Sequence, residues 1–292
     1  MDSQKTVKKA VIAAAGAGTR FLPLTKTIPK EMLPIINKPV IQMIVEDIVA
    51  AGVEEIMIVT APTKGAIEAH FSRNTELEDE LVRRAKPDDA ELIKDIAGLA
   101  NFTFINQTGE PKGNARPIIN AADFIADEPF FFFFADDFFT GEVPASQQLL
   151  EAYQKTGTSV VALMKVPEDQ VGNYGIADVS AQIDDTIVQI RDIDEKPSLQ
   201  DAKSHLAVSC GYLLDTGAVP IIKQEKLGAD GEMSIAYAVK DIADQRGMHG
   251  VVIQGDYHDT GRPASYIKTM IDIALDDPDM GEEIRDYLRN RL

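Results

Sequence analysis

The sequence of 292 residues contains one cysteine, no tryptophan and four histidines. A single cysteine, Cys210, excludes an internal disulfide and any zinc site built from cysteines. The histidines are scattered, and we find no Ser-His-Asp or Cys-His pattern that would indicate a protein nucleophile. Long apolar runs such as Phe130–Ala135 are too short to cross a bilayer, and the amino terminus lacks the apolar stretch of an export signal. We therefore expect a cytoplasmic protein with no membrane partner.

Basic residues are scarce overall and concentrated in one place. The formal net charge is −18, yet residues 1–40 hold seven basic residues and two acidic ones. An acidic chain repels a phosphate backbone, so we expect no nucleic-acid partner. The local excess around AAGAGTRFLPLTKTIPKEMLP, residues 14–34, favours a small ligand that carries several phosphates.

The chain then alternates strand and helix patterns. Residues 7–15 predict a buried strand, residues 40–52 a helix with apolar side chains at helical spacing, and residues 54–61 a second strand. The link between the first strand and the helix is about 25 residues long, whereas such links usually have roughly 2–6. Its glycines, prolines and apolar residues are typical of a folded functional loop.

The remaining segments continue the alternation. Five consecutive phenylalanines, 130–134, predict a strand buried on both faces. The other predicted elements before and after it are a helical segment at 76–98, a strand at 102–106, a helix near 116–127, and helices at 266–277 and 280–292. The pattern predicts an α/β fold: a Rossmann-like three-layer α/β/α sandwich with a mostly parallel mixed central sheet.

The loop after the first strand carries groups suited to an anion. Ligands in such sheets bind at the carboxyl ends of the strands, and Gly16–Arg20 and Asp136 both follow predicted strands. Glycines let backbone N–H groups approach an anion, Arg20 offers a fork of donors, and Lys30 offers a mobile charge. The run G-A-G-T-R matches neither a Walker A motif nor a dinucleotide fingerprint, so by itself it leaves a plain tight turn open.

The longer pattern A-A-G-x-G-T-R-x-x-P-x-T-K…P-K-E-M-L-P…K-P-x-I-Q resembles the signature of the sugar-phosphate nucleotidyltransferase family. Residues 64–81 are similar to a helical insertion of its bacterial members that use UTP and glucose 1-phosphate. The resemblance implies Mg²⁺-dependent transfer of a uridylyl group from UTP to glucose 1-phosphate by direct in-line attack, giving UDP-glucose and pyrophosphate. It also implies a homo-oligomer.

The resemblance further implies one nucleotidyltransferase domain over 1–292. Its nucleotide-binding part covers about 1–140, its sugar-phosphate-binding part about 141–265, and its C-terminal helices 266–292. Gln107 would read the uracil, because an amide presents a donor and an acceptor together. The implied nucleotide-binding residues are Ala14, Ala15, Gly16, Gly18, Thr19, Arg20, Lys30, Gln107 and Gly113. The implied sugar-phosphate-binding residues are Gly175, Glu195, Lys196 and Glu232.

Positive charge and metal would then carry the chemistry. The resemblance assigns Arg20, Lys30 and Lys196 as the catalytic cations, and it assigns Asp136 and Asp259 as the metal ligands, with Asp137 only a neighbour. Mg²⁺ prefers oxygen ligands and is commonly held by one or two carboxylates plus phosphates. From the residues alone, helix-capping or turn aspartates remain the alternative.

Several positions depart from the family pattern. Ala115–Pro117 replace a Gly-His-Ala run, Cys210–Gly211 stand where Gly-Arg is usual, Tyr237 replaces an aspartate, and Arg262–Pro263 replace a position where lysine is common. Most of these changes lie in the sugar half. Two alternatives therefore stay open: a nucleotidyltransferase for another sugar 1-phosphate or dTTP, and a catalytically weak regulatory nucleotide-binding paralogue.

Overall fold

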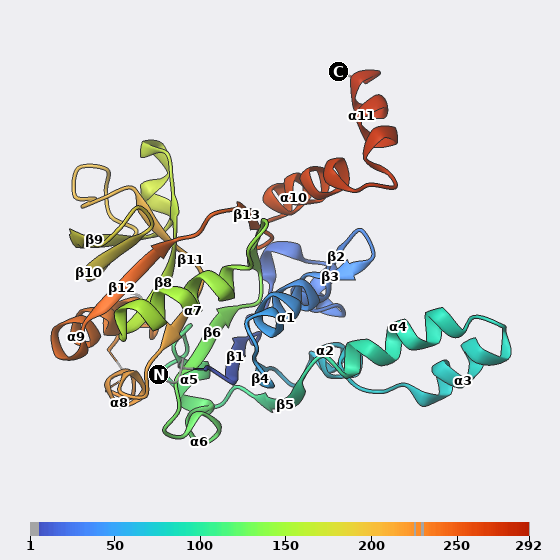
Figure 1. Ribbon diagram of the computed structural model, residues 1–292, viewed down its shortest axis with the longest axis horizontal. Helices are drawn as coiled ribbons and strands as arrows, with labels where there is room; N and C mark the ends of the chain where they lie inside the picture. The colour runs from blue at the N-terminus through green and yellow to red at the C-terminus, as the bar shows by residue number, and fades with distance from the viewer. Residues whose placement is uncertain (1–5, 225, 229–230, 292) are drawn as a thin grey trace.

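The computed structural model describes residues 6–224, 226–228 and 231–291. The strands of its main sheet are β1 (Lys9–Ala13), β4 (Glu55–Thr60), β5 (Asn101–Asn106), β6 (Phe130–Phe134), β8 (Ser159–Lys165), β9 (Gly175–Gln182), β10 (Ile187–Glu195), β11 (Leu206–Leu214) and β12 (Met248–Val252). In the described ranges their order is β5-β4-β1-β6-β11-β8-β12-β10-β9 (Figure 1). Two small ladders pair β2 (Pro34–Ile35) with β3 (Lys38–Pro39), and β7 (Asp137–Thr140) with β13 (Asp256–Asp259).

The two halves of the main sheet differ in direction. Strands β5, β4, β1 and β6 are parallel neighbours, whereas β11 is antiparallel to β6 and β8, and β10 is antiparallel to β12 and β9. Strand β9 also meets β11 at Ile176 and Ala207, so β11, β8, β12, β10 and β9 form a closed ring.

The prediction of an α/β fold with a mixed sheet is confirmed, but the prediction of a mostly parallel sheet is wrong for the second half. A tight turn connects β9 to β10 there. The Asp184 carboxylate accepts the backbone N–H groups of Thr186 and Ile187 in that turn. Strands joined by so short a turn are necessarily antiparallel.

The helices are α1 (Val40–Ala50), α2 (Gly65–His70), α3 (Thr75–Arg83), α4 (Pro87–Ala97), α5 (Arg116–Asn120), α6 (Ala122–Ile125), α7 (Ala145–Thr156), α8 (Ala218–Ile222), α9 (Ala236–Arg246), α10 (Pro263–Asp276) and α11 (Gly281–Arg289). The predicted helical segment 76–98 is two helices, because Ala85 has a positive φ of 58° and Pro87 starts a new helix. None of the helices in the described residues is long and apolar enough to cross a membrane.

Buried side chains form a cluster on each face of the sheet. Phe131 and Phe133 join a cluster with α1 and α7, whereas Phe130 and Phe132 join one with α5, α8 and α9. Successive side chains of a strand point to opposite faces, so the prediction that the phenylalanine run is a strand buried on both faces is confirmed. Cys210 is also a core residue, with no exposed surface.

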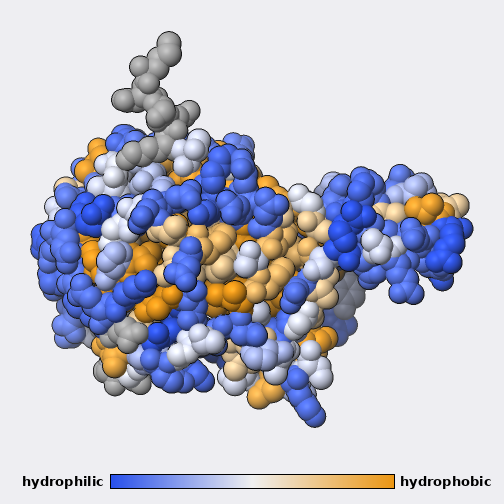
Figure 2. All heavy atoms as spheres, turned by 90° about the horizontal axis from the view of Figure 1, so that it is seen from below, coloured by the Kyte–Doolittle hydropathy of each residue, from blue (hydrophilic) through white to orange (hydrophobic). Residues whose placement is uncertain are grey.

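Helices α3 and α4 project from this core as an arm in Figure 1, and Figure 2 shows the arm covered mainly by hydrophilic residues. The long loop between β1 and α1 is folded, as predicted. It consists of three 3-10 turns, Thr19–Phe21, Leu24–Lys26 and Lys30–Met32, followed by the β2–β3 ladder. Because β1 and β6 are parallel, this loop and Asp136 leave the sheet at the same edge.

Candidate functional site

A cavity of about 650 Å³ opens where the loop after β1 meets the ends of β5 and β6. The lining residues that the sequence predicted are Ala15, Gly16, Lys30, Gln107, Gly113, Asp136 and Glu232. These residues come from segments far apart in the chain. The structure therefore brings the anion loop, the proposed base reader and one proposed metal ligand to a single hollow.

The glycines of the loop have different environments. Gly18 has a φ of 64°, and a Cβ there would lie 3.1 Å from Thr25 Cγ2, while Thr25 Oγ1 donates to the Gly18 carbonyl at 2.8 Å. This turn therefore requires glycine. A Cβ on Gly16 would meet only the end of Lys30, at 3.9 Å, so the Gly16 backbone faces the cavity beside an ammonium group. Ala14 is buried below the cavity, and Gly18 and Thr19 lie in the loop without lining it.

Lys30 is bound to the aspartate that follows β6. Its Nζ donates to Asp136 Oδ2 in a short ion pair. Burial opposes the charge of Lys30, but the carboxylates of Asp136, Glu31 and Asp137 outweigh it, so the pKa of Lys30 lies above its ordinary value. The cation is thus retained in a partly buried position at the cavity wall.

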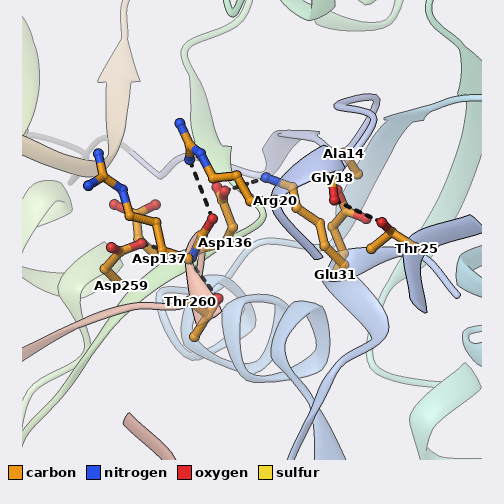
Figure 3. Close-up of polar contacts among 12 residues, drawn as sticks. Ala14, Gly18, Arg20, Thr25, Glu31, Asp136, Asp137, Asp259 and Thr260 are labelled. Carbon is orange, nitrogen blue, oxygen red and sulfur yellow. Dashed lines mark hydrogen bonds and ion pairs between the residues drawn. The ribbon is translucent and has the colours of Figure 1, made fainter. Parts of the chain in front are cut away.

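Asp136 and Asp259 converge on Gly261. A Cβ on Gly261 would lie 3.1 Å from Asp136 Oδ2 and 3.1 Å from Asp259 Oδ1. Arg20 Nη1 donates to the Gly261 carbonyl at 3.3 Å, so this predicted cation lies at the same point (Figure 3). Three residues that are distant in sequence therefore surround one glycine.

Asp137 lies beside these carboxylates and is more deeply buried than they are. Its Oδ2 accepts from the Tyr257 hydroxyl at 3.0 Å, whereas its buried Oδ1 has no hydrogen-bond partner. Burial, followed by the charge of Asp136, raises the pKa of Asp137 to about 8. Asp136 and Asp259, which are only partly buried, are the carboxylates that a cation can reach at this place.

The donor set fits magnesium only if the substrate completes it. Within the described residues there is no group of three or more His, Cys, Asp or Glu side chains arranged to hold a metal ion. Two carboxylates that both closely approach Gly261 do match the usual protein share of a Mg²⁺ site, in which phosphates and waters supply the remaining ligands.

The predicted sugar-phosphate residues form a second group. Gly175 of β9 pairs in register with Glu195 of β10, and a Cβ on Gly175 would lie 3.1 Å from Glu195 Oε2. Lys196 has a positive φ of 49°, its backbone N–H donates to the Tyr174 carbonyl at 3.0 Å, and its Nζ lies 3.7 Å from Glu195 Oε1. These three residues lie together but do not line the 650 Å³ cavity; Glu232 does.

The turn at residues 109–116 carries the departures from the family pattern nearest to the cavity. Arg116 is buried, its Nε donates to the Pro111 carbonyl at 2.9 Å, and a Cβ on Gly109 would lie 3.4 Å from its Nη1. The Met233 backbone N–H donates to the Lys112 carbonyl at 2.7 Å. The turn that carries Gly113 is thus bonded to the segment that carries Glu232.

Sequence reasoning missed several residues of the site, among them Glu31 and Lys64. Both are buried, and Lys64 Nζ donates to both carboxylate oxygens of Glu31 and to the Ala14 carbonyl. Glu31 had a signal, since it is the only acidic residue between Asp2 and Glu46. Lys64 had none, because its approach to the loop depends on the pairing of β1 with β4.

Comparison with known proteins identifies the group that this chain resembles. A family model described as nucleotidyl transferase matches residues 9–275. A UTP–glucose-1-phosphate uridylyltransferase of Staphylococcus epidermidis is 38% identical over 285 residues, which cover 98% of each chain. The enzyme of the same name, YngB, from Bacillus subtilis is 38% identical over 98% of this chain and 96% of its own length.

Solved structures agree with these sequence matches. The UTP-bound UGPase from Acinetobacter baumannii has a TM-score of 0.89 and 28% identity, covering 97% of this chain and 99% of its own. A UDP-glucose pyrophosphorylase complexed with UDP-glucose has a TM-score of 0.83 and 33% identity, covering 93% of this chain and all of its own. The similarity therefore extends over almost the whole chain in both sequence and fold.

Proposed function

The chain belongs to the nucleotidyl transferase family, and on this premise we propose that it transfers the uridylyl group of UTP to glucose 1-phosphate, giving UDP-glucose and pyrophosphate. One observation carries the proposal. The 650 Å³ cavity gathers the loop glycine Gly16, the cation Lys30 and the amide Gln107. These groups suit the phosphates and the base of one nucleotide.

In this proposal UTP lies across the cavity from the β5 end to the loop. Gln107 follows β5, and its backbone N–H donates to the Thr60 carbonyl at 2.8 Å, which fixes the start of its side chain. Its amide and the backbone near Gly113 face the uracil. The Gly16 backbone and the Lys30 ammonium face the phosphates, and Arg20 approaches them from the side of Gly261.

The reaction needs no protein nucleophile. An oxygen of the sugar phosphate attacks the α-phosphorus of UTP, the new O–P bond forms, and the bond between the α-phosphorus and the pyrophosphate oxygen breaks. The protein's part is to hold two anions in line and to offset their repulsion with fixed positive charge. Lys30 and Arg20 supply that charge on the nucleotide side.

The sugar phosphate is assigned to the β9–β10 group and to Glu232. Gly175 leaves room for a close approach, Glu195 accepts hydrogen bonds from sugar hydroxyls, and Lys196 binds the phosphate. Lys196 has the unusual positive φ expected where a backbone is constrained at a functional site.

Asp136 and Asp259 would hold a Mg²⁺ ion between them and the nucleotide phosphates. When bound, the ion would offset the negative charge that develops on the phosphate oxygens. Lys30 is paired with Asp136 in this structure, so it is also positioned to pair with a phosphate oxygen close to the same carboxylate.

The alternative that the enzyme uses dTTP or another sugar 1-phosphate rests on the turn at 109–116 and on Pro117, which follows it. UTP and dTTP differ in the base by one methyl group, and the Pro117 ring lines the cavity where the family usually has a smaller residue. The test is pyrophosphate release with Mg²⁺, scanning UTP and dTTP against glucose 1-phosphate and other sugar 1-phosphates. Pyrophosphate release with another pair would change the substrate assignment. No release with any pair would contradict the proposal.

The metal assignment has its own test. Asp136→Ala should lower turnover by about a hundredfold or more, as expected when fixed charge stabilisation is lost. It should also weaken binding of Mn²⁺, used as a paramagnetic probe in the presence of UTP. The matched control is Asp127→Ala, which removes an exposed aspartate of the same half. Equal Mn²⁺ affinity in both variants would exclude Asp136 as a ligand.

A further inference from the structure

A buried ion pair lies directly beneath the anion loop. Glu31 is 1% exposed and Lys64 is 5% exposed. Lys64 Nζ donates to Glu31 Oε1 at 2.8 Å, to Glu31 Oε2 at 2.9 Å and to the Ala14 carbonyl at 2.7 Å. An ammonium group has three protons, and these three acceptors use all of them. Lys64 therefore has no donor left for a substrate phosphate.

The pair separates two hollows of the loop. Glu31 lines the 650 Å³ cavity beside Lys30. Lys64 lines a smaller cavity of about 170 Å³, which shares Ala15, Ala17, Lys30 and Ala61 with the first. Two of these shared residues, Ala15 and Ala17, flank Gly16, whose backbone is proposed to meet the phosphates. The pair is thus in position to set both the path and the charge of that segment.

The path of the chain changes at the Ala14 carbonyl. The Ala14 N–H still continues the sheet by donating to the Val59 carbonyl at 2.8 Å. The Ala14 carbonyl accepts from Lys64 instead of from a neighbouring strand. The ladder ends there, and the following residues, Ala15 and Gly16, are directed into the cavity.

Stability alone is a poor reason to keep this pair. Burial raises the pKa of Glu31 and lowers that of Lys64, and each partner's charge opposes the shift. Two buried charges cost solvation energy, and apolar residues of similar volume are often equally stable. A role toward the ligand accounts for the retention of both charges next to a phosphate-binding loop.

We infer that the Glu31–Lys64 pair is a positioning element for the triphosphate of UTP. It fixes the Ala14–Gly16 backbone, and it cancels the charge of a carboxylate that would otherwise repel the phosphates. The inference rests on the proposed function, since it concerns the nucleotide end of the same cavity. It adds two residues that contact neither substrate.

The two single variants separate this role from a purely structural one. Lys64→Met leaves the Glu31 charge uncompensated and frees the Ala14 carbonyl, so the KM for UTP should rise at least tenfold. Glu31→Gln removes the negative charge but keeps Lys64 as the donor to the Ala14 carbonyl. The KM for UTP should therefore stay equal or fall. The KM for glucose 1-phosphate should change less than twofold in both. A pair that serves only the fold would raise the KM for UTP in both variants or in neither.

A double variant covers the case in which Lys64→Met does not fold. Glu31→Gln with Lys64→Met contains no uncompensated buried charge, and thermal denaturation will show whether it is folded. It lacks the ammonium donor to Ala14, so the KM for UTP should rise about threefold. Lys9→Met is the matched control, because Lys9 is a partly buried lysine at the other end of β1 that binds the Phe124 carbonyl and Glu128. It should leave the KM for UTP unchanged.

Titration calorimetry with UTP alone makes the result independent of turnover. Weaker UTP binding in the double variant, with unchanged binding in Lys9→Met, would support the positioning role. UTP affinity within twofold of the parent protein in every folded variant would overturn it, while leaving the uridylyl transfer of the parent intact. Failure of the parent protein to release pyrophosphate would instead count against the proposed function, and the UTP titration would still decide the role of the pair.

Discussion

Single charged residues determine which ligands the loop after β1 is able to bind. Arg20 is exposed, and within the described residues its guanidinium hydrogen-bonds only the Gly261 carbonyl, so most of its five N–H donors are available to a ligand. An arginine fork matches phosphate oxygens in geometry as well as in charge. In the proposed function this residue, more than any glycine, selects a phosphorylated ligand.

Arg20→Ala should therefore weaken UTP binding about tenfold to a hundredfold. A hydrogen bond to a charged group contributes about 1.5–3 kcal/mol, and each 1.4 kcal/mol corresponds to about tenfold in affinity. Titration of UTP into the purified variant measures the effect. Lys26→Ala removes an exposed charge from the same loop and should have a clearly smaller effect. Equal losses in the two variants would mean that only the net charge of the loop matters.

Gly113 is a second position at which a substitution should have a clear effect. Its φ is 137°, and a Cβ would lie 2.0 Å from the Met233 carbonyl oxygen. Gly113→Ala should separate the turn from the 231–235 segment and raise the KM for both substrates, at a strain cost of about 1–3 kcal/mol. Steady-state kinetics checks this. Gly65→Ala is the control, since a Cβ there meets nothing within 4 Å; indistinguishable kinetics for the two would contradict the prediction.

At this scale the sequence predicted the cavity-lining residues better than those behind them. Lys30, Gln107 and Asp136 were found because they belong to a short recognisable pattern. Lys64 was not, since its role exists only once β4 lies beside β1. A residue whose partners lie in a loop distant in sequence has no local signal.

Among the elements, helix α7 depends on a side chain from α1. The Asp47 carboxylate accepts the backbone N–H groups of Ala145 and Ser146, each at 2.9 Å, and Ser146 Oγ donates back to the Asp47 carbonyl at 2.6 Å. The first N–H groups of a helix have no partner within the helix. Asp47 therefore caps α7 from a distance and fixes the two helices on one face of the sheet.

Asp47→Ala should lower the free energy of unfolding by about 1–2 kcal/mol, the usual loss for an N-terminal cap. Chemical denaturation measures this, and KM values for both substrates should not change because the contact lies outside the cavity. Asp95→Ala, which removes an exposed aspartate of α4, is the control and should be neutral. A neutral result for Asp47→Ala would show that solvent replaces the cap.

Element positions were predicted well where they follow local rules. The helix at 40–52 and the strand at 54–61 match α1 and β4 closely, because apolar spacing determines both. The direction of the later strands was predicted wrongly, as mostly parallel. It depends on a turn at Asp184 that leaves only a short polar pattern in the sequence.

For the whole molecule, the homo-oligomer remains a prediction, and exposed apolar side chains of α10 and α11 offer a surface for it. Ile267 and Ile271 of α10 are 56% and 36% exposed, and Tyr287 of α11 is 56% exposed. Light scattering should give a multiple of 31.9 kDa, and Ile267→Glu should lower it. Leu92→Glu makes the same change on the arm, where Leu92 is 63% exposed, and should not. A monomer at micromolar concentration would contradict the prediction.

The architecture could be predicted only in outline. The α/β class followed from alternation, but closure of the five-strand ring depends on Ile176 and Ala207 meeting across about thirty residues of chain, for which no local pattern exists. The three-layer order, the single domain and the cytoplasmic location stay predictions. The cavity itself needed both halves of the fold, since Gly113 and Glu232 approach through the Met233 pairing.

The position of Cys210 has a practical consequence for solution studies. It is the only cysteine, it has no exposed surface, and burial raises the pKa of its thiol well above the ordinary value. Thiol reagents attack the thiolate of accessible cysteines, so the folded protein is unreactive toward a maleimide dye. One cysteine introduced on the arm and one beside the cavity would then be the only labelled sites. Fluorescence transfer between them would follow the arm during turnover without removing any native residue.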